Sequence, residues 1–150
     1  MKLAIVYTSV TGNTKELAEG IYRISLRKSL DTDMYRIEEF QESYLLQYDT
    51  ILIGTYTWGI GEIPKEMWRL YHAFESLNRK DMFTAVFGTG DSFYPNYCGA
   101  VDLFRDMLYA HTSLTATLKV ELMPQEQDVY RCQLFVESIV KHASNKKIQV

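Results

Sequence analysis

Thr8-Ser9-Val10-Thr11-Gly12-Asn13-Thr14 is the segment from which the rest of the chain can be interpreted. It follows the apolar run Leu3-Ala4-Ile5-Val6-Tyr7 and precedes a helical pattern that begins near Lys15. A strand that leads through a hydroxyl-rich loop into a helix makes an anion site, because free backbone N–H groups and the positive end of the helix dipole point at the loop. Only Lys15 brings positive charge to this loop, and the Gly-Lys-Ser/Thr signature of a P-loop is absent. The segment therefore predicts a phosphate held by neutral donors.

The composition indicates one soluble, globular domain that covers residues 1–150. Hydrophobic residues make up 47% of the chain and charged residues 23%, which is the usual balance for such a domain. A net charge of −3 leaves no basic footprint, so we expect no nucleic-acid partner. The apolar start is too short for a signal sequence, and no segment is long enough to span a membrane. Cys98 and Cys132 form neither a CxxC pair nor a zinc set, which favours two reduced thiols in a cytoplasmic protein.

The hydrophobic pattern switches between strand and helix along the whole chain. We expect strands at residues 2–7, 32–37, 49–55, 82–87 and 114–122, and helices at residues 13–28, 64–77, 100–110 and 125–144. The first run is apolar throughout, as in a strand buried on both faces of a parallel sheet. The second predicted strand, residues 32–37, carries charged residues, which suits a strand at the edge of the sheet. Residues 38–47 fit either a loop or a short helix.

This alternation predicts a three-layer, doubly wound α/β fold with five parallel strands. Right-handed crossovers with helices on both faces favour the strand order 2-1-3-4-5. In such sheets a ligand lies outside the carboxyl ends of the strands, at the switch point, which here falls between strands one and three. Three loops begin at that edge, at Thr8, Tyr56 and Gly88. We therefore expect one site built from all three loops.

The two later loops carry aromatic residues that suit a planar ligand. Residues 56–62 offer Trp58 as a stacking face and Gly59 as a point of close backbone approach, although this loop taken alone favours an aromatic side chain that plugs the core. Residues 88–99 add Tyr94, which can cover the opposite face of the ligand. Two aromatic residues from separate loops, together with a phosphate loop, predict a site for a flat aromatic phosphate ester.

These residues resemble the motifs of the short-chain flavodoxins, and the likeness extends over the whole chain. Thr8-x-x-Thr11-Gly12-Asn13-Thr14 is similar to the family's phosphate signature, and Thr57-Trp58-Gly59 is similar to its first flavin loop. The second flavin loop has the longest match, Gly90-Asp91-Ser92-x-Tyr94-x-x-Tyr97-Cys98-Gly99-Ala100-Val101-Asp102. The chain has no room for the fifth-strand insertion of long-chain members. The resemblance implies a flavodoxin-like fold and non-covalently bound FMN.

The resemblance also assigns residues to parts of FMN. Trp58 would cover the inner face of the flavin, Tyr94 would cover the outer face, and Gly59 would face flavin N5. Cys98 would act through its backbone, without thiol chemistry. The phosphate loop would supply Thr8, Ser9, Val10, Thr11, Gly12, Asn13 and Thr14. The other FMN-binding positions would be Thr55, Tyr56, Thr57, Ile60, Gly88, Thr89, Gly90, Asp91 and Tyr97. No catalytic residue and no metal ligand are implied.

The family function implied is low-potential, one-electron carriage rather than enzymatic turnover. The flavin would shuttle between semiquinone and hydroquinone, taking electrons from a flavodoxin reductase or another donor and passing them to acceptor redox enzymes. We expect these protein contacts to be transient and the protein to be a cytoplasmic monomer. The net charge is less negative than in many flavodoxins, so acids near the flavin edge should matter more than the total charge.

Two devices for tuning the flavin can be proposed from the sequence. A peptide carbonyl after Gly59 can accept a hydrogen bond from reduced N5, and glycine tolerates the positive φ that this requires. Ile60 follows, where relatives often carry a small or acidic residue, and a β-branched side chain disfavours positive φ at the second central position of a turn. Our hypothesis is that Ile60 favours the carbonyl-up turn and so the semiquinone. Nearby acids such as Asp91 and Glu62 would lower the second potential, because the fully reduced flavin is an anion.

Other functions fit the sequence less well. A flavodoxin-like maturase of manganese ribonucleotide reductase would have a curtailed second flavin loop, and quinone reductases of this fold carry longer insertions. A phosphoacceptor signalling domain needs clustered acids after the first strand, where this chain has Tyr7-Thr8-Ser9. A binding module that has lost FMN stays open as an alternative, although all three loops are intact.

Overall fold

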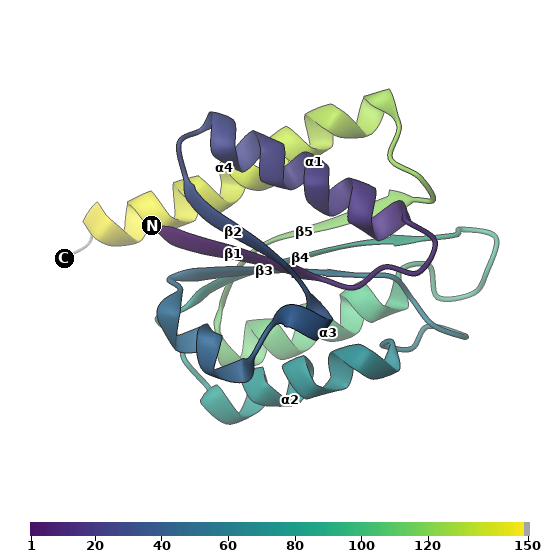
Figure 1. Cartoon of the computed structure of the whole chain (residues 1–150), viewed down its shortest axis with the longest axis horizontal. Helices are drawn as coiled ribbons and strands as arrows, with labels where there is room; N and C mark the ends of the chain where they lie inside the picture. Colours follow the sequence, from purple (N-terminus) through teal and green to yellow (C-terminus); the bar gives the residue numbers. More distant parts are fainter. Residues whose placement is uncertain (149–150) are drawn as a thin grey trace.

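The structure, a computed structural model of the chain, describes residues 1–148. Its centre is one parallel sheet of five strands in the order β2-β1-β3-β4-β5, which confirms the predicted order. The strands are β1 (Lys2–Tyr7), β2 (Asp31–Arg36), β3 (Thr50–Thr55), β4 (Phe83–Gly90) and β5 (Ser113–Glu121). In Figure 1 the strands run from the side of the N-terminus toward the loops at the opposite end of the molecule.

Helices cover both faces of this sheet. Figure 1 shows α1 and α4 on one face and α2 and α3 on the other. Their bounds are α1 (Asn13–Arg27), α2 (Trp68–Leu77), α3 (Gly99–His111) and α4 (Glu126–Ile148). None of the helices in residues 1–148 is both long and apolar enough to cross a membrane.

The core consists of two layers because successive side chains of a strand point to opposite faces. Val6 of β1 joins a buried cluster with Phe74 and Phe104 from α2 and α3. Its neighbour Ile5 joins a second buried cluster with residues of α1 and α4, among them Phe135. The predicted apolar stripe of the first helix, Leu17, Ile21 and Ile24, is buried in this second cluster. The sheet is therefore fixed from both sides, and its carboxyl edge is a rigid platform for the loops.

The second predicted helix, at residues 64–77, is divided in the structure. Pro64 has φ −56° and ψ 142°, which is extended backbone, so no helix begins there. A 3₁₀ turn, η3 (Lys65–Met67), precedes α2 instead. Residues 38–47, which the sequence left open, contain most of two further 3₁₀ helices, η1 (Ile37–Glu39) and η2 (Glu42–Gln47).

Two further element ends differ from the prediction by three residues or more, whereas most of the others differ by no more than one residue. The fourth strand was expected to end at residue 87, but β4 continues to Gly90 because its last residues pair with β5, as in Gly88 with Lys119 and Gly90 with Glu121. Gly88, Thr89 and Gly90 are thus strand residues rather than loop residues. The last helix was expected to end at residue 144 and runs to Ile148.

Candidate functional site

The loop after β1 leads into α1 with its donors free. Gly12 caps the helix at φ 95°, a left-handed conformation that glycine adopts without strain. Within residues 1–148, the backbone N–H groups of residues 10 to 14 have no hydrogen-bond partner. Ser9 Oγ accepts the Lys15 N–H at 3.2 Å, so its own hydroxyl proton remains available. Unpaired N–H groups at a helix N-terminus and hydroxyl donors form the donor set that phosphate prefers.

A pair of threonine hydroxyls joins the start of α1 to the end of β4. Thr14 Oγ1 and Thr89 Oγ1 lie 2.7 Å apart, and both side chains are buried. Thr14 belongs to the first turn of α1 and Thr89 to the last residues of β4. The contact therefore fixes the start of α1 against the end of β4, across the intervening strand β3.

Glu66 connects the starts of the first and second loops, a role that no sequence motif indicates. Its Oε2 accepts hydrogen bonds from the Thr8 hydroxyl at 2.7 Å and from the Tyr56 hydroxyl at 2.8 Å. Burial alone would raise the pKa of Glu66, but the bonds from Thr8, from its own backbone and from Tyr56 hold this pKa below its ordinary value. Burial and the same contact raise the pKa of Tyr56 to about 12. The Thr8 hydroxyl, expected on a phosphate, donates its proton to a carboxylate here.

The second loop is a tight hairpin. Trp58 N–H donates to the Glu62 carbonyl at 2.8 Å, and Glu62 N–H donates back to the Trp58 carbonyl at 2.7 Å. The Gly61 N–H also donates to the Trp58 carbonyl, which closes a turn with Gly59 and Ile60 at its centre. Gly59 has φ 55°, whereas Ile60 is not among the residues with positive φ. Positive φ at the first central residue alone is the pattern of a type II′ turn.

The third loop, residues 91–98, folds back on the start of α3. Asp91 Oδ1 accepts the Phe93 N–H at 2.9 Å, which is an Asx turn. Cys98 precedes α3 with φ 52°, and its side chain is buried against Gly90. Burial raises the pKa of the Cys98 thiol to about 11, while the contacts of this thiol with Tyr97 and Lys119 pull in the opposite direction. A buried, protonated thiol is a poor nucleophile, in keeping with a backbone role for Cys98.

The second and third loops touch directly. Asn96 Nδ2 donates to the Ile60 carbonyl at 2.6 Å, and the Ala100 N–H donates to Thr57 Oγ1 at 3.2 Å. A Cβ on Gly99 would lie 2.8 Å from backbone atoms of Gly61, so only glycine at position 99 allows the backbones of these two segments to approach this closely.

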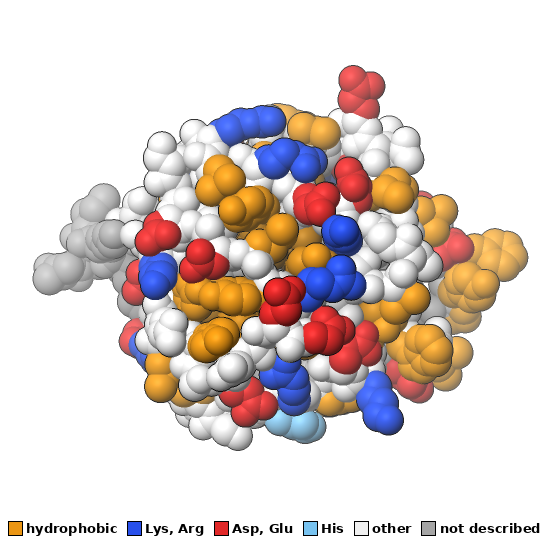
Figure 2. Space-filling view, in the orientation of Figure 1, with side chains coloured by type: hydrophobic (Ala, Val, Ile, Leu, Met, Phe, Trp, Pro, Cys, Tyr) orange, Lys and Arg blue, Asp and Glu red, His pale blue; other side chains and the backbone are white. Residues whose placement is uncertain are grey.

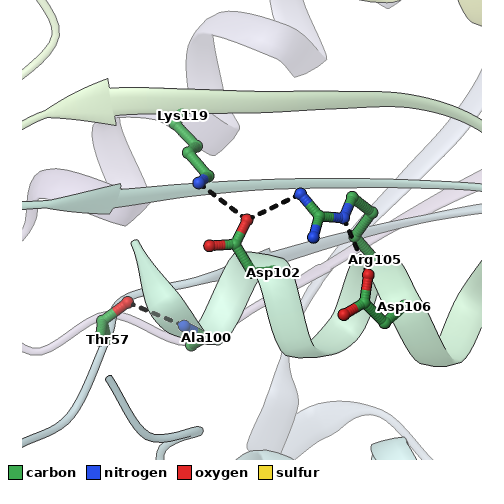
Figure 3. A network of polar contacts seen from close by, with 6 residues as sticks. All are labelled: Thr57, Ala100, Asp102, Arg105, Asp106 and Lys119. Atoms are coloured by element: carbon green, nitrogen blue, oxygen red, sulfur yellow. Dashed lines mark hydrogen bonds and ion pairs between the residues drawn. The ribbon is translucent and has the colours of Figure 1, made fainter. Parts of the chain in front are cut away.

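The start of α3 is also held from the other side. Figure 3 shows the Thr57 contact together with Asp102, which lies between two basic side chains. Asp102 Oδ1 lies 2.7 Å from Lys119 Nζ and 3.0 Å from Arg105 Nη1. All three side chains are partly exposed, so we attribute alignment of α3 with β5 to these ion pairs rather than much stability.

A cavity of about 230 Å³ opens between the second and third loops. Seven of the predicted residues line it, and so do Pro95 and Asn96, which were not among the predicted residues. The seven are Thr57, Gly59, Gly90, Asp91, Tyr94, Tyr97 and Cys98. A cavity of about 310 Å³ between α1 and residues 124–132 contains none of the predicted residues.

Aromatic and aliphatic side chains stand exposed around this cavity. Trp58 and Tyr94 are each 62% exposed, and Ile60 is 71% exposed. In Figure 2 hydrophobic side chains gather at the edge of the molecule where Figure 1 places these loops. Exposed aromatic faces beside a cavity suit a planar ring. Together with the anion-binding loop, the arrangement fits a flat aromatic phosphate ester such as FMN.

Two other predicted positions lie beneath the site rather than in it. Thr55 is fully buried, and its hydroxyl donates to the Tyr56 carbonyl at 2.7 Å. Gly88 lies inside the sheet, where a Cβ would overlap the Thr55 carbonyl and Val101. Their contribution is to bring β3 and β4 together at the platform edge.

Comparison with known proteins identifies the family. The flavodoxin family model matches residues 5–131. Probable flavodoxin 1 of Bacillus subtilis is 37% identical over 155 aligned residues, which cover 99% of this chain and 98% of that protein.

Solved structures agree with this assignment. Oxidised flavodoxin 1 from Bacillus cereus is 36% identical, with a TM-score of 0.88 over 95% of this chain and 99% of its own. A short-chain flavodoxin associated with a non-canonical PDU bacterial microcompartment is 27% identical, with a TM-score of 0.89 and the same coverage. The chain therefore belongs to the flavodoxins of the short-chain type, which are FMN-containing electron carriers and not enzymes.

Proposed function

We propose that this flavodoxin carries single electrons at low potential from a flavodoxin reductase, or another electron donor, to acceptor redox enzymes. FMN supplies the one-electron chemistry, and the protein sets how readily each electron is taken up. The observation that carries the proposal is the cavity between the second and third loops, with exposed Trp58 and Tyr94 beside it and a phosphate-type loop next to it. The proposal includes one domain over residues 1–150, a monomeric state and a cytoplasmic location.

The residues proposed to hold FMN divide into two groups. For the phosphate we propose Ser9, Thr11 and Asn13 together with the free N–H groups of the loop, because these donors have no competing protein acceptor among residues 1–148. Thr8 and Thr14 support the same loop, since their hydroxyls bind Glu66 and Thr89. Their proposed role is to shape the loop rather than to donate to the phosphate.

The flavin ring is proposed to lie between Trp58 and Tyr94. Both side chains are exposed, so stacking on a ring would remove apolar surface from water without disturbing the core. Asp91, Tyr97 and Cys98 line the cavity, and their backbone groups are proposed to meet the polar edge of the ring. The Gly59 carbonyl is proposed as the acceptor for a proton on flavin N5.

Acidic side chains near the cavity are proposed to oppose negative charge on the fully reduced cofactor. Asp91 lines the cavity, and Glu62 closes the neighbouring hairpin. Glu121 lies beside the third loop, where it accepts a hydrogen bond from Ser92. The same acids are proposed to contact basic partner proteins, with exposed apolar side chains of the loops between them.

One experiment tests the proposal as a whole. The purified protein should bind FMN at a ratio of one to one and appear yellow. Stepwise reduction should then produce the long-wavelength absorption of one-electron-reduced flavin before the fully reduced form. A flavodoxin reductase with NADPH should reduce the bound FMN, and the rate should fall as salt screens the acidic surface. A protein that stays colourless in excess FMN would overturn the proposal.

A further inference from the structure

The hairpin from Trp58 to Glu62 is held by hydrogen bonds at every peptide but one. The Trp58 carbonyl accepts from both the Gly61 and the Glu62 N–H groups, which fixes the first and last peptides of the turn. The peptide between Ile60 and Gly61 is bound at both ends, by Gly61 N–H to Trp58 and by the Ile60 carbonyl to Asn96. Within residues 1–148, neither group of the Gly59–Ile60 peptide has a partner.

Among the residues that the structure describes, only Asn96 reaches this turn from outside the hairpin with a side-chain hydrogen bond. Its Nδ2 lies 2.6 Å from the Ile60 carbonyl oxygen. Its Cβ packs against Gly61, where an added Cβ would come within 2.7 Å of it. The Asn96 carbonyl accepts the Gly99 N–H at 2.8 Å, so the residue is itself tied to the start of α3.

The backbone conformation at position 96 suits asparagine better than most other residues. Its φ is 58°, a left-handed conformation that asparagine tolerates better than most residues. This conformation, together with the Gly99 contact, places the Asn96 side chain against the hairpin. The second and third loops are thereby joined by a side-chain amide.

We propose that Asn96 is a positioning residue that confines conformational change in the hairpin to the Gly59–Ile60 peptide. Rotation of this peptide requires changes at ψ of Gly59 and φ of Ile60, while the next peptide stays fixed by Asn96 and Trp58. The turn then loses its conformational entropy on folding and not when the Gly59 carbonyl binds the cofactor. This inference rests on the proposed function, in which that carbonyl accepts a hydrogen bond from reduced FMN.

Loss of the Asn96 amide should therefore weaken the first one-electron reduction more than the binding of oxidised FMN. Asn96→Gly retains access to positive φ and removes the amide. Asn78→Gly is the matched control, because Asn78 also has positive φ, 44°, but caps α2 at the other end of the sheet. For Asn96→Gly we expect a roughly tenfold smaller equilibrium constant for the first reduction, which is about 59 mV for a one-electron couple. The control should match the wild type.

Backbone hydrogen exchange of the FMN-free protein provides a second readout. Exchange at the Gly61 and Glu62 N–H groups should accelerate at least tenfold in Asn96→Gly and in the nearly isosteric Asn96→Asp, which lacks the donor. Asn96→Asp is judged by exchange alone, because its charge would shift the potentials by itself.

The outcomes separate this inference from the proposed function. Unchanged exchange in both Asn96 variants would overturn the anchoring role. Faster exchange with an unchanged first reduction would show a structural contact only and would overturn the positioning role. If the wild-type protein failed to bind FMN, the proposed function would fall while the exchange experiment still decided the anchoring.

Discussion

The hydroxyl of Thr8 donates a hydrogen bond to Glu66 Oε2 over 2.7 Å, and the Tyr56 hydroxyl donates to the same oxygen. Thr8 follows β1, Tyr56 follows β3, and Glu66 lies in the 3₁₀ turn before α2. One carboxylate therefore connects the starts of two loops of the site. Because it accepts two hydroxyl protons, its ionised form is favoured, and its pKa lies below the ordinary value of 4.5 although burial opposes this.

Glu66→Gln should lower the free energy of unfolding at pH 7 by about 1–2 kcal/mol, because an amide oxygen accepts weaker hydrogen bonds than a carboxylate. The sign of the pH dependence follows from the depressed pKa. The stabilisation is present above the unfolded-state pKa and is lost as pH falls through the folded-state pKa. Urea unfolding between about pH 5 and pH 3 should thus show a steeper loss in the wild type than in Glu66→Gln. The exposed Glu39→Gln serves as the control, and equal slopes in all three proteins would refute the role of Glu66.

Thr11→Ala should weaken FMN binding and leave both reduction potentials nearly unchanged. Thr11 is exposed and makes no side-chain hydrogen bond with any residue of 1–148. A hydrogen bond to a charged phosphate contributes about 1.5–3 kcal/mol, which corresponds to about 10- to 150-fold in Kd. Fluorescence titration measures the affinity, and the FMN-free protein should keep its stability within about 0.5 kcal/mol. A large shift of either reduction potential would contradict the view that the phosphate loop sets FMN affinity and not the reduction potentials.

Trp58→Ala should reduce FMN affinity without destabilising the FMN-free protein. The indole is 62% exposed, so its removal leaves no cavity in the core. Loss of one stacking face costs about 1–3 kcal/mol by analogy with bases stacked on aromatic side chains. Trp68→Ala is the matched control, because Trp68 stacks on His72 in α2 rather than near the cavity. Equal affinity losses in the two variants would argue against Trp58 as a flavin contact.

Ile60→Gly should decrease the maximal yield of one-electron-reduced FMN. In the structure Gly59 has φ 55° and Ile60 does not have positive φ, so the turn already has the signs expected of type II′. Glycine at position 60 would admit positive φ at the second central residue and make competing turns accessible. Photoreduction followed by absorption spectroscopy measures the yield. An unchanged or higher yield would disprove the hypothesis for Ile60.

The two thiols should resist alkylation in the folded protein. Cys98 and Cys132 are buried, and burial raises the pKa of each thiol to about 11. A raised pKa leaves little thiolate, the reactive form, at pH 8, and the fraction increases only as pH approaches 11. Mass spectrometry after iodoacetamide treatment at about pH 8 should detect two labels in denaturant and none without it. Rapid labelling of native Cys98 would show that the third loop opens.

The fold could be predicted where local pattern and tertiary packing agree. The continuous apolar run of β1, the stripe Leu17–Ile21–Ile24 of α1 and the glycine before that helix all appear in the structure as expected. The extension of β4 was missed because Gly88 and Gly90 favour a loop by local propensity, whereas pairing with β5 determines their conformation. Pro64 was placed in a helix because its φ suits a first turn, but its ψ is extended.

The candidate site could be predicted in outline but not in its supporting contacts. Asn96 and Glu66 act on residues 36 and 58 positions away in the chain, at Ile60 and Thr8. No short sequence motif predicts such a contact, because either residue would also suit a solvent-exposed turn. The motif residues were recognisable because glycine, aromatic and hydroxyl side chains recur at fixed spacing around a ligand.

The order of the strands has a consequence for the size of ligand that fits. β1, β3 and β4 are neighbours, and each is followed by one loop of the site. Adjacent strands lie about 4.8 Å apart, so the outermost of these loops leave the sheet about 10 Å apart. A ligand that engages all three must match this span, and riboflavin, which ends short of a phosphate, would forgo the donors after β1. The distance between the strands therefore selects ligands by their length as well as by their chemistry.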